Sequence, residues 1–223
     1  MMSLHAILFD HDGTLVDSEA THLQLWRQVV APFGVEIRER DYWEQMLGVP
    51  VERNAADLIR IYGIDAGATE LVQAKLEANE RFLRDSCFPA MPGASRILQS
   101  LAGQVRLGLV SGSQRNCVEA SLRGHGWQTL FEQVVTGDDV SRNKPRPDGY
   151  LKALEQMRLE ASDCLAVEDT EVGVRAARAA GLQVIAIRSP LAGSHDFSAA
   201  SAVVDSLEGA HDWIRTEYKE ISS

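Results

Sequence analysis

Two carboxylates, Asp10 and Asp12, follow directly after a short apolar run near the start of the sequence. The run, residues 6–9, is apolar at every position, which is typical of a strand buried on both faces of a parallel sheet. Side chains alternate along an extended chain, so the two carboxylates share one side and His11 points elsewhere. Carboxylates held this close repel each other unless a proton or a cation lies between them. The stretch therefore predicts a binding site at the end of a strand.

The elements that must position these carboxylates alternate between strands and helices from residue 94 onward. This alternation predicts a parallel sheet with helices on both of its faces. The predicted strands after the first are residues 105–110, 134–136, 164–167 and 184–187, and a tail that contains Val203 and Val204 follows the last of them. The predicted helices are residues 94–101, 114–125, 148–157, 172–180 and a last one from about residue 207.

Residues 18–88 interrupt the strand pattern and predict helices alone. Their apolar positions recur at helical spacing, and glycines separate the segments. The helices are expected at residues 21–33, 39–48, 51–62 and 69–83. The predicted fold class is therefore α/β: a doubly wound, Rossmann-like parallel-sheet core, with a small all-α four-helix domain inserted into it. The predicted boundaries are 1–16 and 89–223 for the core and 17–88 for the insertion.

Further candidate residues follow the other predicted strands or precede a helix: Ser111, Gly112 with its backbone N–H, Lys144, Glu168 and Asp169. In such a sheet, ligands bind beyond the carboxyl ends of the strands, so these residues are expected to meet the first carboxylate pair. Carboxylate oxygens are the ligands that Mg²⁺ prefers. Hydroxyl and backbone N–H groups near the start of a helix, together with a lysine, bind anions. The set predicts a site for Mg²⁺ and phosphate.

Other polar residues beside these positions have simpler interpretations. Ser113 and Thr170 each precede a predicted helix and are expected to cap it. Asp17 and Asp148 are interpreted as caps or braces of a loop rather than as catalysts. His11 is expected to have a packing or hydrogen-bonding role.

Four short motifs resemble the signature motifs of the haloacid dehalogenase superfamily, and specifically those of its phosphatases. They are D-H-D-G-T at residues 10–14, S-G-S at 111–113, K-P-R-P-D at 144–148 and E-D-T at 168–170. The motifs occur in the family's order, and the resemblance covers essentially the whole chain. The helical insertion lies where this family inserts a cap domain, in the branch that contains phosphoglycolate phosphatase, sugar-phosphate phosphatases and β-phosphoglucomutase.

The resemblance implies a role for each motif residue. Asp10 would be the nucleophile that forms an aspartyl-phosphate, and Asp12 the general acid and base. Ser111, with Gly112 beside it, and Lys144 would bind the phosphate. The implied Mg²⁺ ligands are the side chains of Asp10, Glu168 and Asp169 and the backbone carbonyl of Asp12.

The cap is expected to select the leaving group, because closure of a helical lid brings further contacts to the substrate. The candidate contacts are His22, Gly48 and Arg53, with Lys75 and Asn79 more remote. His22 matches a histidine in the corresponding helix of β-phosphoglucomutase. Trp26 is interpreted as part of the cap core. The expected substrate is a small phosphorylated metabolite: a sugar or polyol phosphate, or phosphoglycolate.

Two alternatives to the phosphatase remain open. A β-phosphoglucomutase-like mutase would need a second phosphate grip in its cap, and Val51 stands about where β-phosphoglucomutase has an arginine, with Arg53 two residues later. A non-catalytic module that binds a phosphorylated ligand would be expected to carry a broken motif, and none is broken.

Composition limits the remaining classes. The 223 residues are 24% charged and 45% hydrophobic, which is ordinary for a globular protein, and the longest apolar runs are too short to cross a membrane. A formal charge of −10 disfavours a nucleic-acid surface. The first apolar run is too short for a signal peptide, so a cytoplasmic location is expected. A monomer is the expected state.

Overall fold

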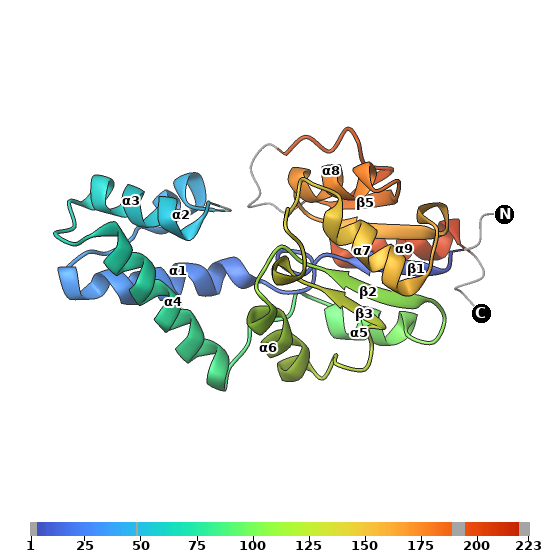
Figure 1. Cartoon of the computed structure of the whole chain (residues 1–223), viewed down its shortest axis with the longest axis horizontal. Helices are drawn as coiled ribbons and strands as arrows, with labels where there is room; N and C mark the ends of the chain where they lie inside the picture. Colours follow the sequence, from blue (N-terminus) through green and yellow to red (C-terminus); the bar gives the residue numbers. More distant parts are fainter. Residues whose placement is uncertain (1–3, 48, 189–194, 219–223) are drawn as a thin grey trace. The chain divides into compact units, whose positions relative to one another are not determined.

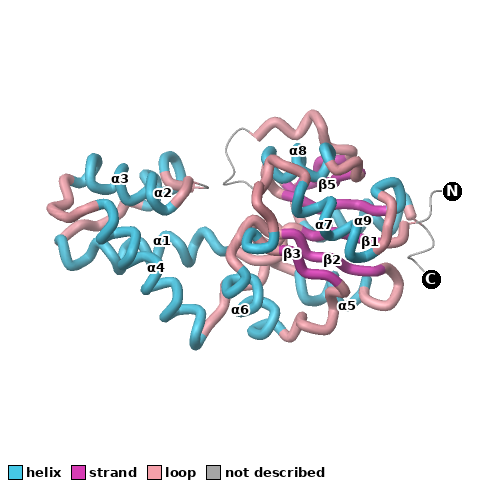
Figure 2. The backbone as a smooth tube through the Cα atoms, in the orientation of Figure 1, coloured by secondary structure: helices cyan, strands magenta, loops and turns pink. Residues whose placement is uncertain are grey.

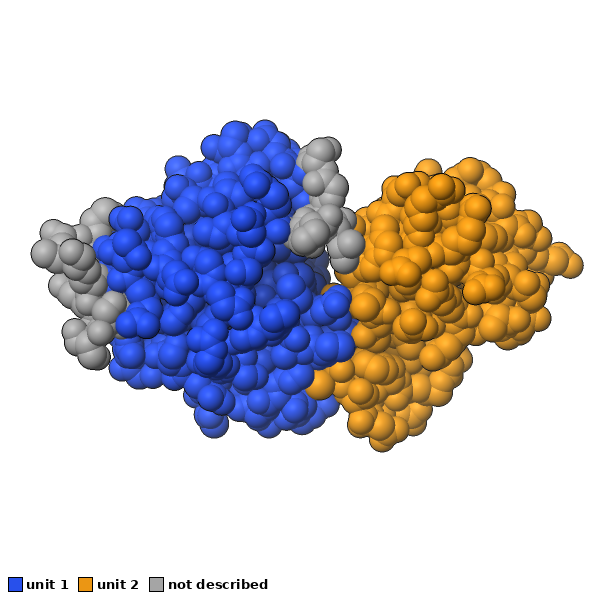
Figure 3. Space-filling model, turned by 180° about the vertical axis from the view of Figure 1, so that it is seen from behind, with its two compact units in different colours: residues 1–17, 88–223 blue, residues 18–87 orange. Residues whose placement is uncertain are grey.

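The computed structural model describes residues 4–47, 49–188 and 195–218. The chain divides into two compact units, coloured separately in Figure 3. Unit 1 consists of Met1–Asp17 and Phe88–Ser223, and unit 2 is Ser18–Cys87. Each crossing between the units falls one residue from the boundary expected from the sequence.

Unit 1 is built on a six-stranded sheet in the order β3-β2-β1-β4-β5-β6, and all neighbouring strands are parallel (Figure 1). The predicted α/β class with a parallel, doubly wound sheet is therefore confirmed. Within the described residues, the strands belong to unit 1 alone (Figure 2). The strands are β1 (Ala6–Phe9), β2 (Arg106–Val110), β3 (Gln133–Val135), β4 (Cys164–Glu168), β5 (Gln183–Ile187) and β6 (Ala202–Val204).

Strand β1 lies at the centre of this sheet and is fully buried, which explains why its residues are all apolar. It pairs with β2 on one side and β4 on the other, so that Phe9 is level with Leu109 and with Val167. The backbone N–H of Asp10 extends this ladder by donating to the carbonyl of Val167 at 2.9 Å. This register brings the residues that follow β1, β2 and β4 to one edge of the sheet.

Helices cover the sheet of unit 1. Helices α7 and α8 share one apolar cluster with Ala6 and Leu8 of β1, whereas α5 and α9 pack against each other. Alternation along β1 places Ala6 and Leu8 on the same face of the sheet. The helices are α5 (Ala94–Leu101), α6 (Arg115–His125), α7 (Asp148–Met157), α8 (Glu171–Ala179) and α9 (Leu207–Glu217), each within one residue of its predicted position.

Unit 2 contains α1 (Ser18–Val30), α2 (Glu39–Gln45), α3 (Val51–Tyr62) and α4 (Ala68–Asp85). The first helix begins three residues before its predicted start, and its expected last turn, Ala31–Phe33, is a 3₁₀ turn closed by Gly34 with positive φ. The second helix ends at Gln45, three residues before the predicted Gly48, which lies outside the described residues. Trp26 is 2% exposed and lies in the apolar core of this unit, as predicted.

The two ends of unit 1 that lead toward unit 2 are hydrogen-bonded to each other. Val16 and Ala90 form an antiparallel bridge. The N–H of Asp17 donates to the carbonyl of Pro89, and the N–H of Met91 to the carbonyl of Leu15, both at 2.8 Å. These bonds hold the two segments that connect the units, residues 15–17 and 89–91, next to each other in unit 1.

Among the helices of the described segments, none combines the length and the apolar character needed to cross a membrane.

Candidate active site

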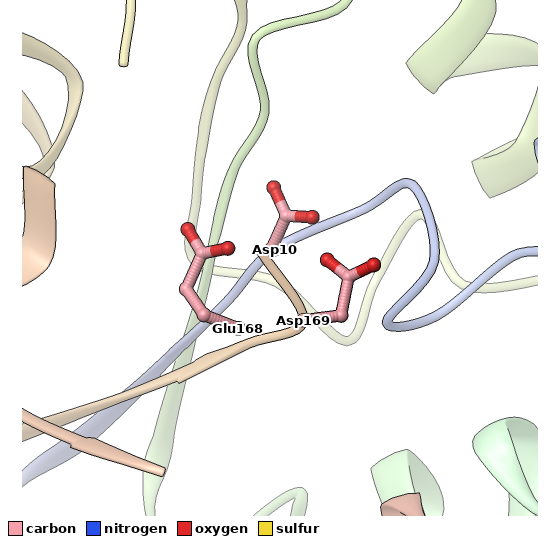
Figure 4. A group of neighbouring side chains, drawn as sticks. All are labelled: Asp10, Glu168 and Asp169. Atoms are coloured by element: carbon pink, nitrogen blue, oxygen red, sulfur yellow. The ribbon is translucent and has the colours of Figure 1, made fainter. Parts of the chain in front are cut away.

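Three carboxyl groups meet where β1 and β4 end (Figure 4). Asp10 follows β1, Glu168 is the last residue of β4, and Asp169 comes next. One carboxylate oxygen from each residue lies within 4.8 Å of the others. Asp10 and Asp169 are 7% exposed and Glu168 is fully buried. The sheet register has thus brought together residues almost 160 positions apart in the sequence.

Lys144 contacts two of these three carboxyl groups. Its Nζ contacts Oδ1 of Asp10, lies 2.7 Å from Oε1 of Glu168 and donates to the carbonyl of Val110 at 2.9 Å. The lysine is mostly buried, with 13% of its side chain exposed. A buried ammonium requires partners of this kind, since an isolated buried charge is costly. One positive charge therefore faces three carboxyl groups.

This imbalance of charge changes the pKa values of all four groups. Burial and the charge of Asp10 raise the pKa of Glu168 to about 7. Burial and the neighbouring carboxylates likewise raise the pKa of Asp10 and, more strongly, that of Asp169. Burial alone would lower the pKa of Lys144, but Asp10 and Glu168 raise it above its ordinary value. The group needs more positive charge than Lys144 supplies.

The acidic group fits a divalent cation. Oε2 of Glu168 and Oδ1 of Asp169 are buried and have no hydrogen-bond partner. A buried acceptor without a partner costs free energy, and a metal ion would satisfy both oxygens. The donor set consists of carboxylate oxygens, which suits a hard cation such as Mg²⁺. Asp10, Glu168 and Asp169 are therefore the residues that could hold a metal.

Asp12 has a different environment from that of Asp10. Its side chain is 29% exposed, and its Oδ2 accepts hydrogen bonds from Oγ of Ser113 at 2.7 Å and from Oγ of Ser111 at 3.3 Å. Nδ1 of His11 lies 3.1 Å from the same oxygen. The two carboxylates of the D-x-D pair thus have separate partners: Lys144 for Asp10, and two serine hydroxyl groups and the His11 ring for Asp12.

Two expectations about these neighbours require correction. Ser113 does not cap α6: the N-cap residue is Gln114, without a side-chain cap, and the Ser113 hydroxyl bonds to Asp12 instead. His11 does not turn away from Asp12, because the chain leaves the extended conformation after Phe9, where β1 ends. In contrast, Thr170 caps α8 as predicted, accepting from the N–H of Gly173 at 3.1 Å.

The Ser111 loop forms the remaining wall. Ser111 is 4% exposed, and its Oγ also accepts from the N–H of Ser113 at 2.9 Å. Gly112 lies against Gly137, where a Cβ would come 2.3 Å from the carbonyl oxygen of Gly112. Only glycine fits at residue 137 without moving this loop.

Two residues of the site were not found by sequence reasoning. Tyr150, fully buried on α7, donates to Oε1 of Glu168 at 2.5 Å, and its ring lies 5.4 Å from Nζ of Lys144. Gly173, in the first turn of α8, leaves room for Glu168: a Cβ there would lie 1.9 Å from Oε2. The available signals were a tyrosine just after the K-P-R-P-D motif and a glycine inside a helix.

The candidate residues of unit 2 lie in two places. Nδ1 of His22 is 3.3 Å from Nζ of Lys75, which lies 5.7 Å from the centre of the Trp26 ring. Lys75 is 3% exposed. Arg53 is on α3 with 70% of its side chain exposed and pairs with Asp57 at 2.9 Å. The structure does not bring Arg53 and His22 into one described cluster, and Gly48 lies outside the described residues.

Known proteins share this fold and sequence pattern. The family model for haloacid dehalogenase-like hydrolases matches residues 7–187. The fructose-1-phosphate phosphatase YqaB of Escherichia coli is 32% identical over 82% of this chain and 95% of its own length. CbbY from Rhodobacter sphaeroides, solved in complex with xylulose-1,5-bisphosphate, is 26% identical with a TM-score of 0.75, covering 92% of this chain and 95% of its own. A putative β-phosphoglucomutase from Thermotoga maritima has a TM-score of 0.80 at 26% identity, covering 96% and 99%.

The chain belongs to the haloacid dehalogenase-like hydrolase family. Within it, the protein is an enzyme of the phosphatase branch, as the sequence motifs predicted.

Proposed function

We propose that the protein is a Mg²⁺-dependent phosphatase that hydrolyses a small phosphorylated metabolite through an aspartyl-phosphate on Asp10. The observation that carries the proposal is the position of the Asp10 carboxyl group, beside Lys144 and within 4.8 Å of the carboxylates of Glu168 and Asp169. A nucleophilic carboxylate divides one difficult hydrolysis into two easier steps. Positive charge on both sides of it offsets repulsion from an anionic phosphate.

Each residue has a distinct part in this mechanism. Lys144 holds Asp10 in place and neutralises charge on the transferring phosphoryl group. Ser111 and the N–H groups of the loop that contains Gly112 bind phosphate oxygens. Asp12 protonates the oxygen of the leaving group as the ester bond breaks, and later takes a proton from the water that attacks the aspartyl-phosphate.

Asp10, Glu168 and Asp169 would hold the metal together with the backbone carbonyl of Asp12. When bound, Mg²⁺ supplies positive charge that neutralises the phosphate oxygens. The unpartnered oxygens of Glu168 and Asp169 support this assignment, because both are buried beside Asp10.

For the substrate we propose a sugar phosphate, with polyol phosphates and phosphoglycolate as further members of the class. The support comes from the relatives: one is a fructose-1-phosphate phosphatase, and another was solved with xylulose-1,5-bisphosphate. We further propose that unit 2, residues 18–87, acts as a cap that selects the leaving group. Its candidate contacts are His22 and Arg53, with the Gly48 segment between them in sequence, and the expected state is a monomer in the cytoplasm.

A mutase is the second candidate, supported by the fold shared with the putative β-phosphoglucomutase. A mutase must hold two phosphate groups, so unit 2 would have to supply a cation for the second one. Arg53 is the exposed arginine nearest to the expected position, and in this structure it pairs with Asp57. The phosphatase is preferred because the fructose-1-phosphate phosphatase is more similar in sequence to this chain than the putative mutase, at 32% identity against 26%.

A phosphate-release screen tests the proposal. Purified protein is incubated with sugar phosphates, polyol phosphates, phosphoglycolate and nucleotides, with Mg²⁺ or with EDTA. Release of inorganic phosphate that requires Mg²⁺ is the expected result, and isomerisation of a sugar phosphate without release would indicate the mutase. Activity that is unaffected by EDTA would contradict the metal assignment.

A further inference from the structure

The carboxyl group of Asp12 is held at one oxygen by three neighbouring groups. Ser113, His11 and Ser111 contact Oδ2 at 2.7, 3.1 and 3.3 Å, respectively. An oxygen that accepts several hydrogen bonds is a poor site for a proton, since each donor stabilises the unprotonated form. A proton on Oδ2 is therefore disfavoured.

His11 has the geometry of a dedicated donor in this group. Its ring is fully buried, and its other nitrogen, Nε2, has no hydrogen-bond partner. The ring also makes an edge contact with Phe88, at 6.5 Å between ring centres. An N–H at Nε2 would be a buried donor without an acceptor, which is costly, so the proton of the neutral imidazole belongs on Nδ1. Nδ1–H then donates to Asp12.

Ser111 is a weaker candidate for the same role. Its contact with Asp12 is the longest of the three, and in the proposed function its hydroxyl turns to the phosphate when substrate binds. That leaves His11 and Ser113 to hold Asp12 during the reaction. The imidazole is the stiffer of these two, because a ring packed against Phe88 has fewer rotamers than a hydroxyl group.

We propose that His11 is a positioning residue for proton transfer: with Ser113 it holds Oδ2 of Asp12, so that Oδ1 gives its proton to the leaving group and later receives one from water. The inference rests on the proposed function, since it assigns a partner to the general acid of that mechanism. In the first step, a bond forms between a carboxylate oxygen of Asp10 and phosphorus, the ester P–O bond breaks, and the proton of Asp12 passes to the departing oxygen. Positioning of this kind is effective because small displacements of a reacting group cost much rate.

The leaving group supplies the readout. An alkyl alcohol leaves only when it is protonated, whereas 4-nitrophenolate leaves as a stable anion. Loss of a well-placed general acid therefore slows hydrolysis of an alkyl phosphate more than that of 4-nitrophenyl phosphate. The quantity to compare is kcat/KM, because it reports the steps up to departure of the leaving group and not the later hydrolysis of the aspartyl-phosphate.

The experiment measures kcat/KM for a sugar phosphate and for 4-nitrophenyl phosphate in His11→Leu, which removes the donor and puts an apolar side chain in its place. We expect about a tenfold loss for the sugar phosphate, the equivalent of one hydrogen bond, and less than about a twofold loss for the aryl ester. His11→Asn, whose amide N–H takes nearly the place of Nδ1, should recover most of the loss. Ser113→Ala should change the ratio in the same direction, which keeps the test open if His11→Leu folds poorly.

His211→Leu is the matched control, because His211 is also buried and bonded to a serine, Ser100, but lies on α9 away from the site. It should leave the ratio unchanged. Equal losses for both esters in His11→Leu, or no loss for either, would overturn the inference. If Asp12→Asn itself leaves the ratio unchanged, the proposed role of Asp12 fails; if Asp12→Asn lowers the ratio and His11→Leu does not, only the role of His11 fails.

Discussion

The candidate residues of unit 1 converge, whereas those of unit 2 do not. Asp10, Lys144 and Glu168 come from three distant segments and contact one another at the edge of the sheet. In unit 2, His22 lies beside a buried lysine, while Arg53 is exposed and paired within its own helix. Parallel strands deliver their ends to one place by their topology, and helices have no equivalent rule.

The candidate residues of the two units also differ in how their charges are balanced. The unit 1 cluster contains more carboxylates than one lysine can neutralise, so it requires a ligand. In unit 2, Asp57 is already paired with both Arg53 and Arg60. Carboxylates that lack enough positive charge indicate a binding site, whereas arginines that already pair with a carboxylate do not.

The most severe test of the unit 1 cluster is Asp10→Asn. Removing the proposed nucleophile should lower kcat by about 10⁴-fold or more, measured by phosphate release. Asp163→Asn is the matched control. Asp163 directly precedes the first residue of β4, at the end of the strand away from Glu168, and its carboxylate lies 3.6 Å from the His5 ring. Its activity should be that of the wild type. Full activity in Asp10→Asn would contradict the aspartyl-phosphate mechanism.

Asp12→Asn should separate the two carboxylates of the pair. We expect kcat to fall by about 10²–10⁴-fold, the usual contribution of a positioned acid and base. The affinity for Mg²⁺, measured by calorimetry, should change little, because the Asp12 carboxyl group is held by Ser113 and His11. Equal losses of activity and of metal affinity would refute this division of roles.

Gly173→Ala should weaken binding of the proposed metal ion by displacing Glu168. A Cβ there would lie 1.9 Å from Oε2 of Glu168 and push the carboxylate away. Alanine in a helix otherwise stabilises it by about 1 kcal/mol, so a loss of function cannot be ascribed to helix propensity. We expect the Mg²⁺ concentration for half-maximal activity to rise about tenfold or more. Gly67→Ala, where a Cβ has nothing within 4 Å, should leave it unchanged.

Arg53→Gln tests whether unit 2 selects the leaving group. Arg53 and Arg60 are similarly exposed and both pair with Asp57, so Arg60→Gln is a closely matched control. If Arg53 contacts the substrate, its substitution should raise KM for the preferred sugar phosphate by a factor of about 3–10, with little change for 4-nitrophenyl phosphate. The same KM in both variants would remove Arg53 from the substrate site.

The smallest expected effect is on stability without metal. Glu168 has an ordinary pKa of 4.5 and a folded-state pKa of about 7, so the folded protein binds more protons than the unfolded chain between these values. The stabilisation is complete below pH 4.5 and is lost as the pH rises through about 7. In EDTA, the Tm should therefore fall over this range, and Glu168→Gln should flatten the fall. A Tm that rises toward pH 8 in EDTA would contradict the raised pKa.

The sequence predicted the fold well because buried parallel strands and glycine-bounded helices leave strong patterns. Helices α3, α5 and α7 occupy the predicted residues. The largest errors were three residues each, at the start of α1 and at the end of α2. The first turn of α1 is polar, so apolar spacing does not reveal it. The motif residues Asp10, Lys144 and Glu168 were also chosen from the sequence, because each stands next to a strand end or a helix start.

Sequence reasoning did not find the residues that position the site. Tyr150 lies on a helix face, where one more aromatic residue is indistinguishable from core until the sheet register places it beside Glu168. Ser113 fits the pattern of a helix cap equally well, and only the fold of the loop turns its hydroxyl to Asp12. Contacts of this kind depend on tertiary structure, which local spacing does not encode.

The hydrogen bonds that join Asp17 to Pro89 and Met91 to Leu15 hold together the two points at which the core chain leaves for unit 2 and returns from it. Because the ends of the insertion leave from neighbouring, bonded residues, a short linker could replace residues 18–87 at a small cost in loop-closure entropy. The core would then fold without unit 2, and it could accept insertions of other sizes and sequences at the same position. If unit 2 selects the leaving group, as proposed, a lineage could change its substrate by exchanging one contiguous segment while the proposed phosphoryl-transfer residues stay in place.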